Sequence, residues 1–296
     1  MAREKSKTRG QQMTPKTDVC EAVVDDAELG EGPTWDVAAG RLLWVDILGC
    51  RIHSFDPRSG ADSPMATDQH IGAAKPCLSG GLVTNMRDGI GRYDAANNFR
   101  WLHHRPVPGR RGNDAAVAPD GTLWVGTMRY DERPGGGTLS RIMPDGTAIL
   151  LLDDVTVSNG IGWSPEGRRM YFVDTPTRRI DIFDYTDDGA SGRRPWVEIE
   201  RGAGFPDGLT VDADGAVWVA LWDGGSLRRY TPDGRLDRVV PLPVRRPTAC
   251  AFGGDGLSDL YVTTARVGLT HPDPLAGSLL VLPDIGQGLP QPAFGG

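Results

Sequence analysis

Five polar residues recur at one position of a repeated sequence unit, and their side chains could together bind a metal ion. In each copy the polar residue is followed by an apolar segment, a turn and a second segment with a Trp or Tyr 11 to 13 positions further on. The five residues are Glu31, Asn113, Asn159, Asp207 and Thr248. Carboxylate and amide oxygens are preferred ligands of hard cations such as Ca²⁺, Mg²⁺ and Mn²⁺.

A purely structural role competes with metal binding at these positions. Asn, Asp and Thr are common where a strand begins, because their side chains hydrogen-bond nearby backbone groups. Two acidic side chains that converge on one place, however, repel each other unless a cation lies between them. We therefore favour a metal site over capping for the set as a whole.

The spacing of the copies predicts the elements that hold these side chains. Asp-Gly tips between short segments rich in Val, Leu and aromatic residues indicate hairpins, because glycine adopts the positive φ of such turns. The aromatic residues Trp124, Tyr171, Trp218 and Tyr261 follow one another at 47, 47 and 43 residues. The 80 residues between Trp44 and Trp124 leave room for one more copy, which we place at residues 78–91.

Six copies with this period predict an all-β, six-bladed β-propeller with a central channel. Each blade would be a four-stranded sheet whose innermost strand lines the channel. Equivalent positions in successive blades would then form a ring at one mouth of that channel. We expect this ring to bring the polar residues together.

The composition agrees with this fold and excludes several classes of protein. The 40 Gly and 23 Pro residues are too many for a helix-rich fold, and a net charge of −7 argues against a nucleic-acid partner. No apolar run is long enough to span a membrane. Residues 1–18 lack the apolar core of a secretory signal and are expected to form a disordered tail, with 19–296 as one propeller domain. Four scattered cysteines indicate free thiols and a cytoplasmic location.

Several motifs, matching in sequence order, resemble the SMP-30/gluconolactonase/regucalcin-like family of sugar lactonases. They are Gly30-Glu-Gly-Pro-Thr-Trp, Arg111-Gly-Asn-Asp-Ala, Gly126-Thr-Met, Ser158-Asn-Gly-Ile-Gly-Trp-Ser, Tyr171-Phe-Val-Asp-Thr and Phe205-Pro-Asp-Gly-Leu. The resemblance extends over roughly residues 27–294. It implies a six-bladed propeller with one catalytic divalent cation near the top of the channel.

The resemblance also implies a role for each matching residue. Glu31, Asn159 and Asp207 would be the metal ligands, and Asp207 would also act as the general base. Arg111 and Asn113 would contact the substrate. The cofactor would be one divalent cation, either Ca²⁺, Zn²⁺, Mg²⁺ or Mn²⁺.

Three further expectations concern acidic residues and histidines. A further acidic residue of the family that contacts substrate falls near Asp131, with Glu132 as the alternative. Asp46 and Asp174 follow second-strand aromatic residues and are expected to be structural. The five histidines lack metal-ligand spacing, so we expect them at the surface or in loops.

Together with the metal site expected from the residues, the resemblance implies a metal-dependent hydrolase of sugar-type lactones. A cation would polarise the lactone carbonyl, and Asp207 would deprotonate the attacking water. No Gly-x-Ser-x-Gly motif supports a serine nucleophile. Two alternatives remain open: a phosphotriesterase of the diisopropyl-fluorophosphatase type, and a non-catalytic calcium-binding regulator. A protein-interaction platform is less favoured, because it has no need of acidic side chains at a channel mouth.

Overall fold

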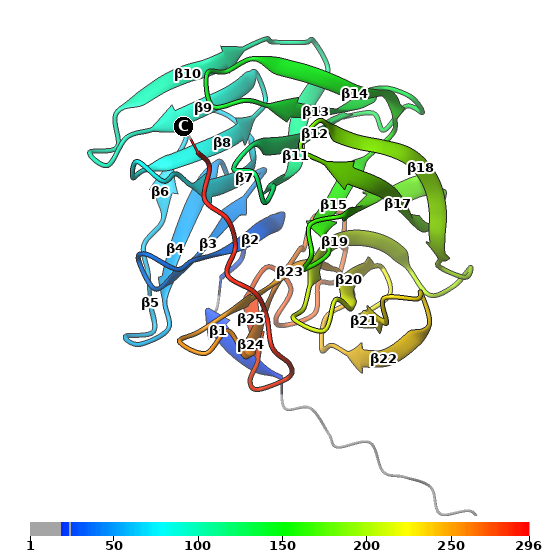
Figure 1. The fold of residues 1–296 in the computed structure, drawn as a ribbon. Helices are drawn as coiled ribbons and strands as arrows, with labels where there is room; N and C mark the ends of the chain where they lie inside the picture. Colours follow the sequence, from blue (N-terminus) through cyan, green and yellow to red (C-terminus); the bar gives the residue numbers. More distant parts are fainter. Residues whose placement is uncertain (1–18, 24, 296) are drawn as a thin grey trace, which may run out of the picture.

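Six antiparallel β-sheets surround a common axis in the computed structural model, which describes residues 19–23 and 25–295 (Figure 1). The described residues form 25 strands and one short 3₁₀ helix, η1 (Thr175–Thr177). The prediction of an all-β, six-bladed propeller is confirmed. Residues 1–18 lie outside the described residues, so the division into a tail and one domain stays a prediction. No helix among the described residues is long and apolar enough to cross a membrane.

The sheets follow one another along the chain as successive blades. The first blade contains β2 (Gly30–Asp36), β3 (Arg41–Asp46), β4 (Arg51–Asp56) and β5 (Ala61–Asp62), with β6 (Met65–Ala66) also paired to β4. The second contains β7 (Ile71–Pro76), β8 (Leu82–Met86), β9 (Gly89–Tyr93) and β10 (Phe99–His104). The third contains β11 (Arg110–Val117), β12 (Leu123–Arg129), β13 (Gly137–Ile142) and β14 (Ala148–Val155).

The remaining three blades complete the ring. The fourth contains β15 (Ser158–Trp163), β16 (Arg169–Asp174), β17 (Arg179–Thr186) and β18 (Gly189–Glu198). The fifth contains β19 (Phe205–Val211), β20 (Val217–Trp222), β21 (Ser226–Tyr230) and β22 (Leu236–Pro241). The sixth contains β23 (Pro247–Gly253), β24 (Asp259–Thr264), β25 (Leu279–Leu282) and β1 (Cys20–Val23). Because β1 pairs with β25, the first and last strands of the described chain share one sheet, which closes the ring.

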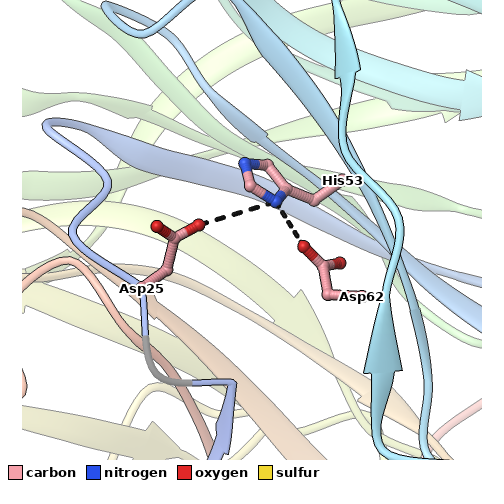
Figure 2. Close-up of side chains that lie close together, drawn as sticks. All are labelled: Asp25, His53 and Asp62. Atoms are coloured by element: carbon pink, nitrogen blue, oxygen red, sulfur yellow. Dashed lines mark hydrogen bonds and ion pairs between the residues drawn. The ribbon is translucent and has the colours of Figure 1, made fainter.

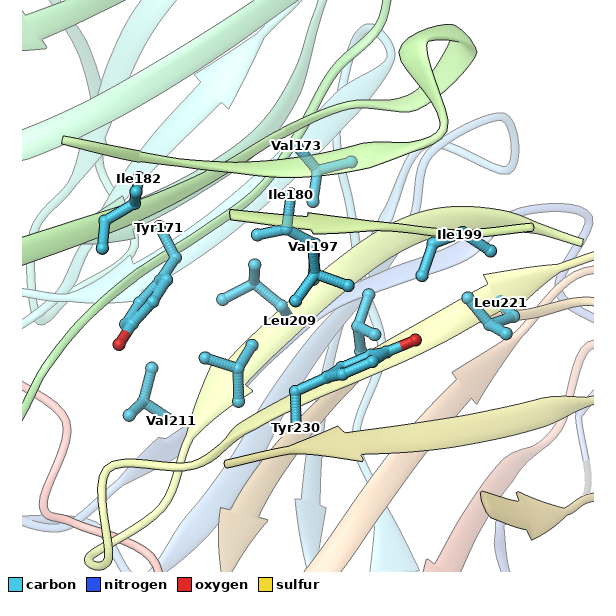
Figure 3. Close-up of a cluster of buried hydrophobic side chains, with 12 residues drawn as sticks. Tyr171, Val173, Ile180, Ile182, Val197, Ile199, Leu209, Val211, Leu221 and Tyr230 are labelled. Carbon is cyan, nitrogen blue, oxygen red and sulfur yellow. The ribbon is translucent and has the colours of Figure 1, made fainter. Parts of the chain in front are cut away.

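The core lies between neighbouring blades. One buried cluster joins Tyr171 and Ile182 of the fourth blade to Leu209, Leu221 and Tyr230 of the fifth (Figure 3). The aromatic residues that mark the repeat are buried in the second strand of their blades. Each blade therefore covers an apolar face of the next, so that no blade is expected to be stable alone.

The second blade differs from its predicted position. Residues 82–86 form the second strand of this blade, and the innermost strand is β7, which begins earlier, at Ile71. The repeat is hidden there because β7 starts with Ile71, Gly72 and Ala73 instead of a polar residue. A Cβ added to Gly72 would lie 2.2 Å from the carbonyl oxygen of Asn113, so only glycine fits beside β11. This blade thus contributes no side chain to the ring.

The C-terminal segment after β25 crosses one face of the propeller and ends beside the second blade (Figure 1). Phe294 is fully buried, its N–H donates to the carbonyl of Pro76, and its own carbonyl accepts from the N–H of Leu78. Residues 289–292 line a cavity of about 360 Å³ together with Lys75 and Asp114. The segment therefore covers the channel at the end away from the ring described below.

Candidate active site

The pairing of the innermost strands is irregular at the predicted ring positions. Regular pairing breaks between Glu31 and Thr34 in β2, Gly112 and Ala115 in β11, Ser158 and Ile161 in β15, and Pro206 and Leu209 in β19. Asn113, Asn159 and Asp207 therefore lie at bulges. A bulge leaves residues unpaired and redirects their side chains, which is a common way to build a site at the end of a strand.

The redirected side chains line one cavity of about 550 Å³. Glu31, Arg111, Asn113, Asn159 and Asp207 all contribute to it, and none is more than 7% exposed. The structure thus brings together four of the five predicted ring residues, and Arg111 with them. Such a pocket, with a few convergent polar groups, is where a small ligand is expected to bind.

Thr248, the fifth predicted ring residue, does not line this cavity. It is fully buried, its hydroxyl donates to the carbonyl oxygen of Gly30 at 2.6 Å, and it hydrogen-bonds Thr263 at 2.8 Å. At this position the structural explanation holds, because the side chain satisfies a backbone group of the neighbouring blade.

Burial makes Glu31 and Asp207, two of the acidic residues that line the cavity, hard to ionise. Burial, followed by the negative charge of Asp114, raises the pKa of Glu31 to about 8. Burial, followed by the charges of Glu31 and Asp114, raises the pKa of Asp207 well above its usual value. Neither carboxyl forms an ion pair with a Lys or Arg among the residues that the structure describes. A bound cation would favour the ionised form of both.

Two buried oxygens in the cavity lack hydrogen-bond partners in the described part of the chain, Asn159 Oδ1 and Asp207 Oδ1. The amide nitrogen of Asn159 donates to Thr175 Oγ1 at 3.1 Å, which leaves Oδ1 as the free end of that side chain. Unsatisfied buried oxygens are costly and rare in native proteins. Together with the carboxylate of Glu31, these all-oxygen donors fit a hard divalent cation.

Arg111 is held in the cavity by short contacts. Its Nη1 donates to Asn113 Oδ1 at 2.5 Å and to the carbonyl of Gly112 at 3.0 Å, while Asn113 Nδ2 donates to the carbonyl of Ser158 at 2.9 Å. Both ends of the Asn113 amide are therefore engaged within the protein, and Asn113 orients the guanidinium. The other N–H groups of Arg111 have no protein partner among the described residues, so they are available to a ligand.

The structure separates the two acidic candidates after the Gly126-Thr-Met motif. The carboxylate of Asp131 accepts from Arg129 Nε at 2.7 Å and Nη2 at 2.8 Å, and the residue does not line the cavity. Glu132 does line it. The turn at 129–132 sends these adjacent side chains in different directions, so we revise the expectation for Asp131 in favour of Glu132.

The acidic residues expected to be structural make backbone contacts. Asp46 accepts from the N–H groups of Glu28 and Leu29, and Asp174 accepts from those of Thr156 and Val157. Each carboxylate thus fixes the backbone of the residues that directly precede an innermost strand, β2 for Asp46 and β15 for Asp174.

One expectation for the histidines was wrong. His53 lies in β4, is only 1% exposed and stacks on Trp44, with ring centroids 3.8 Å apart. His70 hydrogen-bonds the hydroxyl of Tyr130 at 2.6 Å, and Tyr130 lines the cavity.

Several residues of the cavity wall could not be predicted from the repeat. Phe205, Trp222, Arg246 and Val267 line the cavity from strand ends and loops of the fifth and sixth blades. Arg246 pairs with Asp223 at 2.8 Å and lies over the Trp222 ring at 4.6 Å. None of these residues shares a position in the repeat, and only Phe205 falls within one of the family motifs.

Comparison with known proteins identifies relatives over almost the whole described chain. The SMP-30/Gluconolactonase/LRE-like region family matches residues 29–266. The chain is 34% identical over 263 residues to a putative sugar lactone lactonase of Bacillus subtilis, covering 86% of this chain and 90% of the relative. It is 35% identical to a 6-deoxy-6-sulfogluconolactonase of Pseudomonas putida, with coverage of 90% and 95%. A solved calcium-binding protein, regucalcin from Agrobacterium tumefaciens, superimposes with a TM-score of 0.90 at 28% identity, covering 94% and 98%.

Proposed function

The chain belongs to the SMP-30/gluconolactonase/LRE-like family, and on that basis we propose that it hydrolyses sugar-type lactones with one divalent cation. The observation that carries the proposal is the cavity itself. Two buried carboxyls and an amide oxygen lie beside the Arg111 guanidinium, and within the described part of the chain the amide oxygen and several guanidinium donors have no partner. Relatives named as lactonases support the same reaction class.

Glu31, Asn159 and Asp207 would hold the cation through oxygen atoms. When bound, the cation supplies a Lewis acid that stabilises the negative charge developing on the lactone carbonyl oxygen. The all-oxygen set favours Ca²⁺, Mg²⁺ or Mn²⁺, with Zn²⁺ retained as a candidate.

The chain's own residues would bind the lactone and move the proton. Asp207 Oδ1 has no hydrogen-bond partner among the residues that the structure describes, so it can accept a proton from the attacking water, a general-base role worth about 10²–10⁴-fold. Arg111 would donate hydrogen bonds to the substrate, in the orientation that Asn113 fixes. Glu132, on the cavity wall, would accept hydrogen bonds from sugar hydroxyls.

The alternatives use the same site differently. A phosphotriesterase would need the cation and Asp207 but would have no use for a hydroxyl acceptor such as Glu132. A calcium-binding regulator would need the carboxylates, but a buried guanidinium close to the ion would weaken cation binding. Arg111 therefore favours an enzyme that binds a polar substrate.

The test is a pH-indicator assay on metal-stripped protein. Aldonolactones and a phosphotriester are offered with Ca²⁺, Mg²⁺, Mn²⁺ or Zn²⁺ added back. We expect lactone turnover that chelation abolishes and one of these ions restores. The matched control is Asp131→Asn, which removes a carboxylate that lies outside the cavity. This variant should keep full activity. Lactone turnover that survives exhaustive chelation would refute the metal role, and phosphotriester turnover alone would favour the first alternative. A chain that binds the cation but turns over neither substrate would favour the regulator.

A further inference from the structure

We propose a second metal site, built by Asp25, His53 and Asp62 where the first and sixth blades meet, that binds a transition-metal dication such as Zn²⁺. His53 Nδ1 lies 2.6 Å from Asp62 Oδ2 and 3.7 Å from Asp25 Oδ2 (Figure 2). Ligand atoms at zinc bond lengths in a tetrahedral site lie about 3.3 Å apart. The two distances lie on either side of that value, and the three ligand atoms all lie within 4.8 Å of one another.

The three residues come from both sides of the seam that closes the ring. His53 lies in β4 and Asp62 in β5, both in the first blade. Asp25 follows β1 of the sixth blade, where its carbonyl accepts from Ser278 Oγ at 3.3 Å. An ion held by all three would therefore bridge the first and sixth blades.

The histidine is fixed with one nitrogen toward the carboxylates. His53 is 1% exposed and stacks on Trp44, which sets the plane of the imidazole. Nε2 has no partner among the described residues, so it can carry the ring proton when Nδ1 binds a metal. Asp62 Oδ1 is also buried without a partner. The Asp25 and Asp62 side chains are 17% and 13% exposed, which leaves room for a water as fourth ligand.

Charge balance also points to a cation. In the described part of the chain, neither Asp25 nor Asp62 forms an ion pair with a Lys or Arg. Two carboxylates beside a neutral imidazole leave two negative charges in a largely buried place, which a dication neutralises. One nitrogen and two carboxylate oxygens suit Zn²⁺ and similar ions, whereas the all-oxygen cavity suits harder ones. The competing arrangement is a protonated His53 paired with both carboxylates without any metal.

The test measures zinc binding by the full-length, metal-stripped protein. Titration calorimetry and elemental analysis give the number of Zn²⁺ ions bound by the wild type, Asp62→Asn and Asp25→Asn. Asp26→Asn is the matched control, since the Asp26 side chain is 78% exposed and pairs with Arg266. We expect each site variant to lose one equivalent of Zn²⁺ and part of the zinc-induced rise in melting temperature. Asp26→Asn should lose neither, and lactonase activity with the cavity cation present should persist in all variants.

Anomalous scattering from a zinc-soaked wild-type crystal locates the ion without any variant, in case a substitution prevents folding. A peak between Asp25, His53 and Asp62 confirms the site. Equal zinc stoichiometry in wild type and variants, with no peak at the three residues, overturns the proposal in favour of the protonated histidine. Neither result depends on whether the cavity hydrolyses lactones.

Discussion

The burial of the Glu31 carboxyl can be tested directly. In the metal-free protein it should make the free energy of unfolding depend on pH. Burial and the charge of Asp114 raise the pKa of Glu31 from 4.5 to about 8. In the unfolded chain the carboxyl ionises near pH 4.5, whereas the folded state keeps it protonated up to about pH 8. The contribution of Glu31 to stability is therefore full below pH 4.5 and is lost as the pH rises to about 8.

The size of this effect follows from the two pKa values. Each tenfold change in proton affinity is worth about 1.4 kcal/mol, so the loss for Glu31 is on the order of 5 kcal/mol. Glu31→Gln keeps the shape of the side chain and removes the titration. The free energy of unfolding of the wild type should therefore fall, between pH 5 and pH 8, by several kcal/mol more than that of the variant.

The assay is urea unfolding followed by tryptophan fluorescence, at pH 5 and pH 8 with a chelator present. Asp131→Asn is the control: Arg129 lowers the pKa of Asp131 to about 2, so its contribution is lost only as the pH falls below about 4. That variant should follow the wild type between pH 5 and pH 8. Adding the cavity cation should reduce the pH dependence of the wild type, because the cation stabilises ionised Glu31. Identical pH profiles for wild type and Glu31→Gln would refute the buried-carboxyl argument.

Four further predictions test other parts of the molecule. Asp207→Asn should lower kcat by about 10²–10⁴-fold while circular dichroism stays unchanged, and near-normal turnover would remove Asp207 from the mechanism. Arg111→Gln should raise KM more than it lowers kcat in steady-state assays, and a pure kcat effect would contradict a binding role. Glu132→Gln should raise KM for sugar lactones while Asp131→Asn does not, and the reverse result would restore Asp131 as the substrate contact. Phe294→Ala should destabilise the fold by about 3–5 kcal/mol in urea unfolding, and a loss below 1 kcal/mol would mean that the C-terminal segment is not part of the core.

The sequence alone was enough to predict the fold, because a propeller is built from one local unit used six times. Hairpin turns and the aromatic residues of second strands are local signals, and their spacing revealed the period. Glu31, Asn113, Asn159 and Asp207 could be found for the same reason, since residues at one position of a repeat take equivalent places around the axis. The repeat failed only at β7, where Gly72 and its small neighbours carry no polar or aromatic signal.

Contacts between residues far apart in the chain were decided by the tertiary structure alone. Thr248 shares the repeat position of Asp207, yet it caps the neighbouring blade because Gly30 lies within reach of its hydroxyl. Asp131 and Glu132 are adjacent, and only the direction of a turn places one of them in the cavity. His53 meets Asp62 through the pairing of β4 with β5, but it meets Asp25 only because β1 lies beside the first blade. A local pattern specifies which strand a side chain belongs to, but the packing of distant strands determines what that side chain touches.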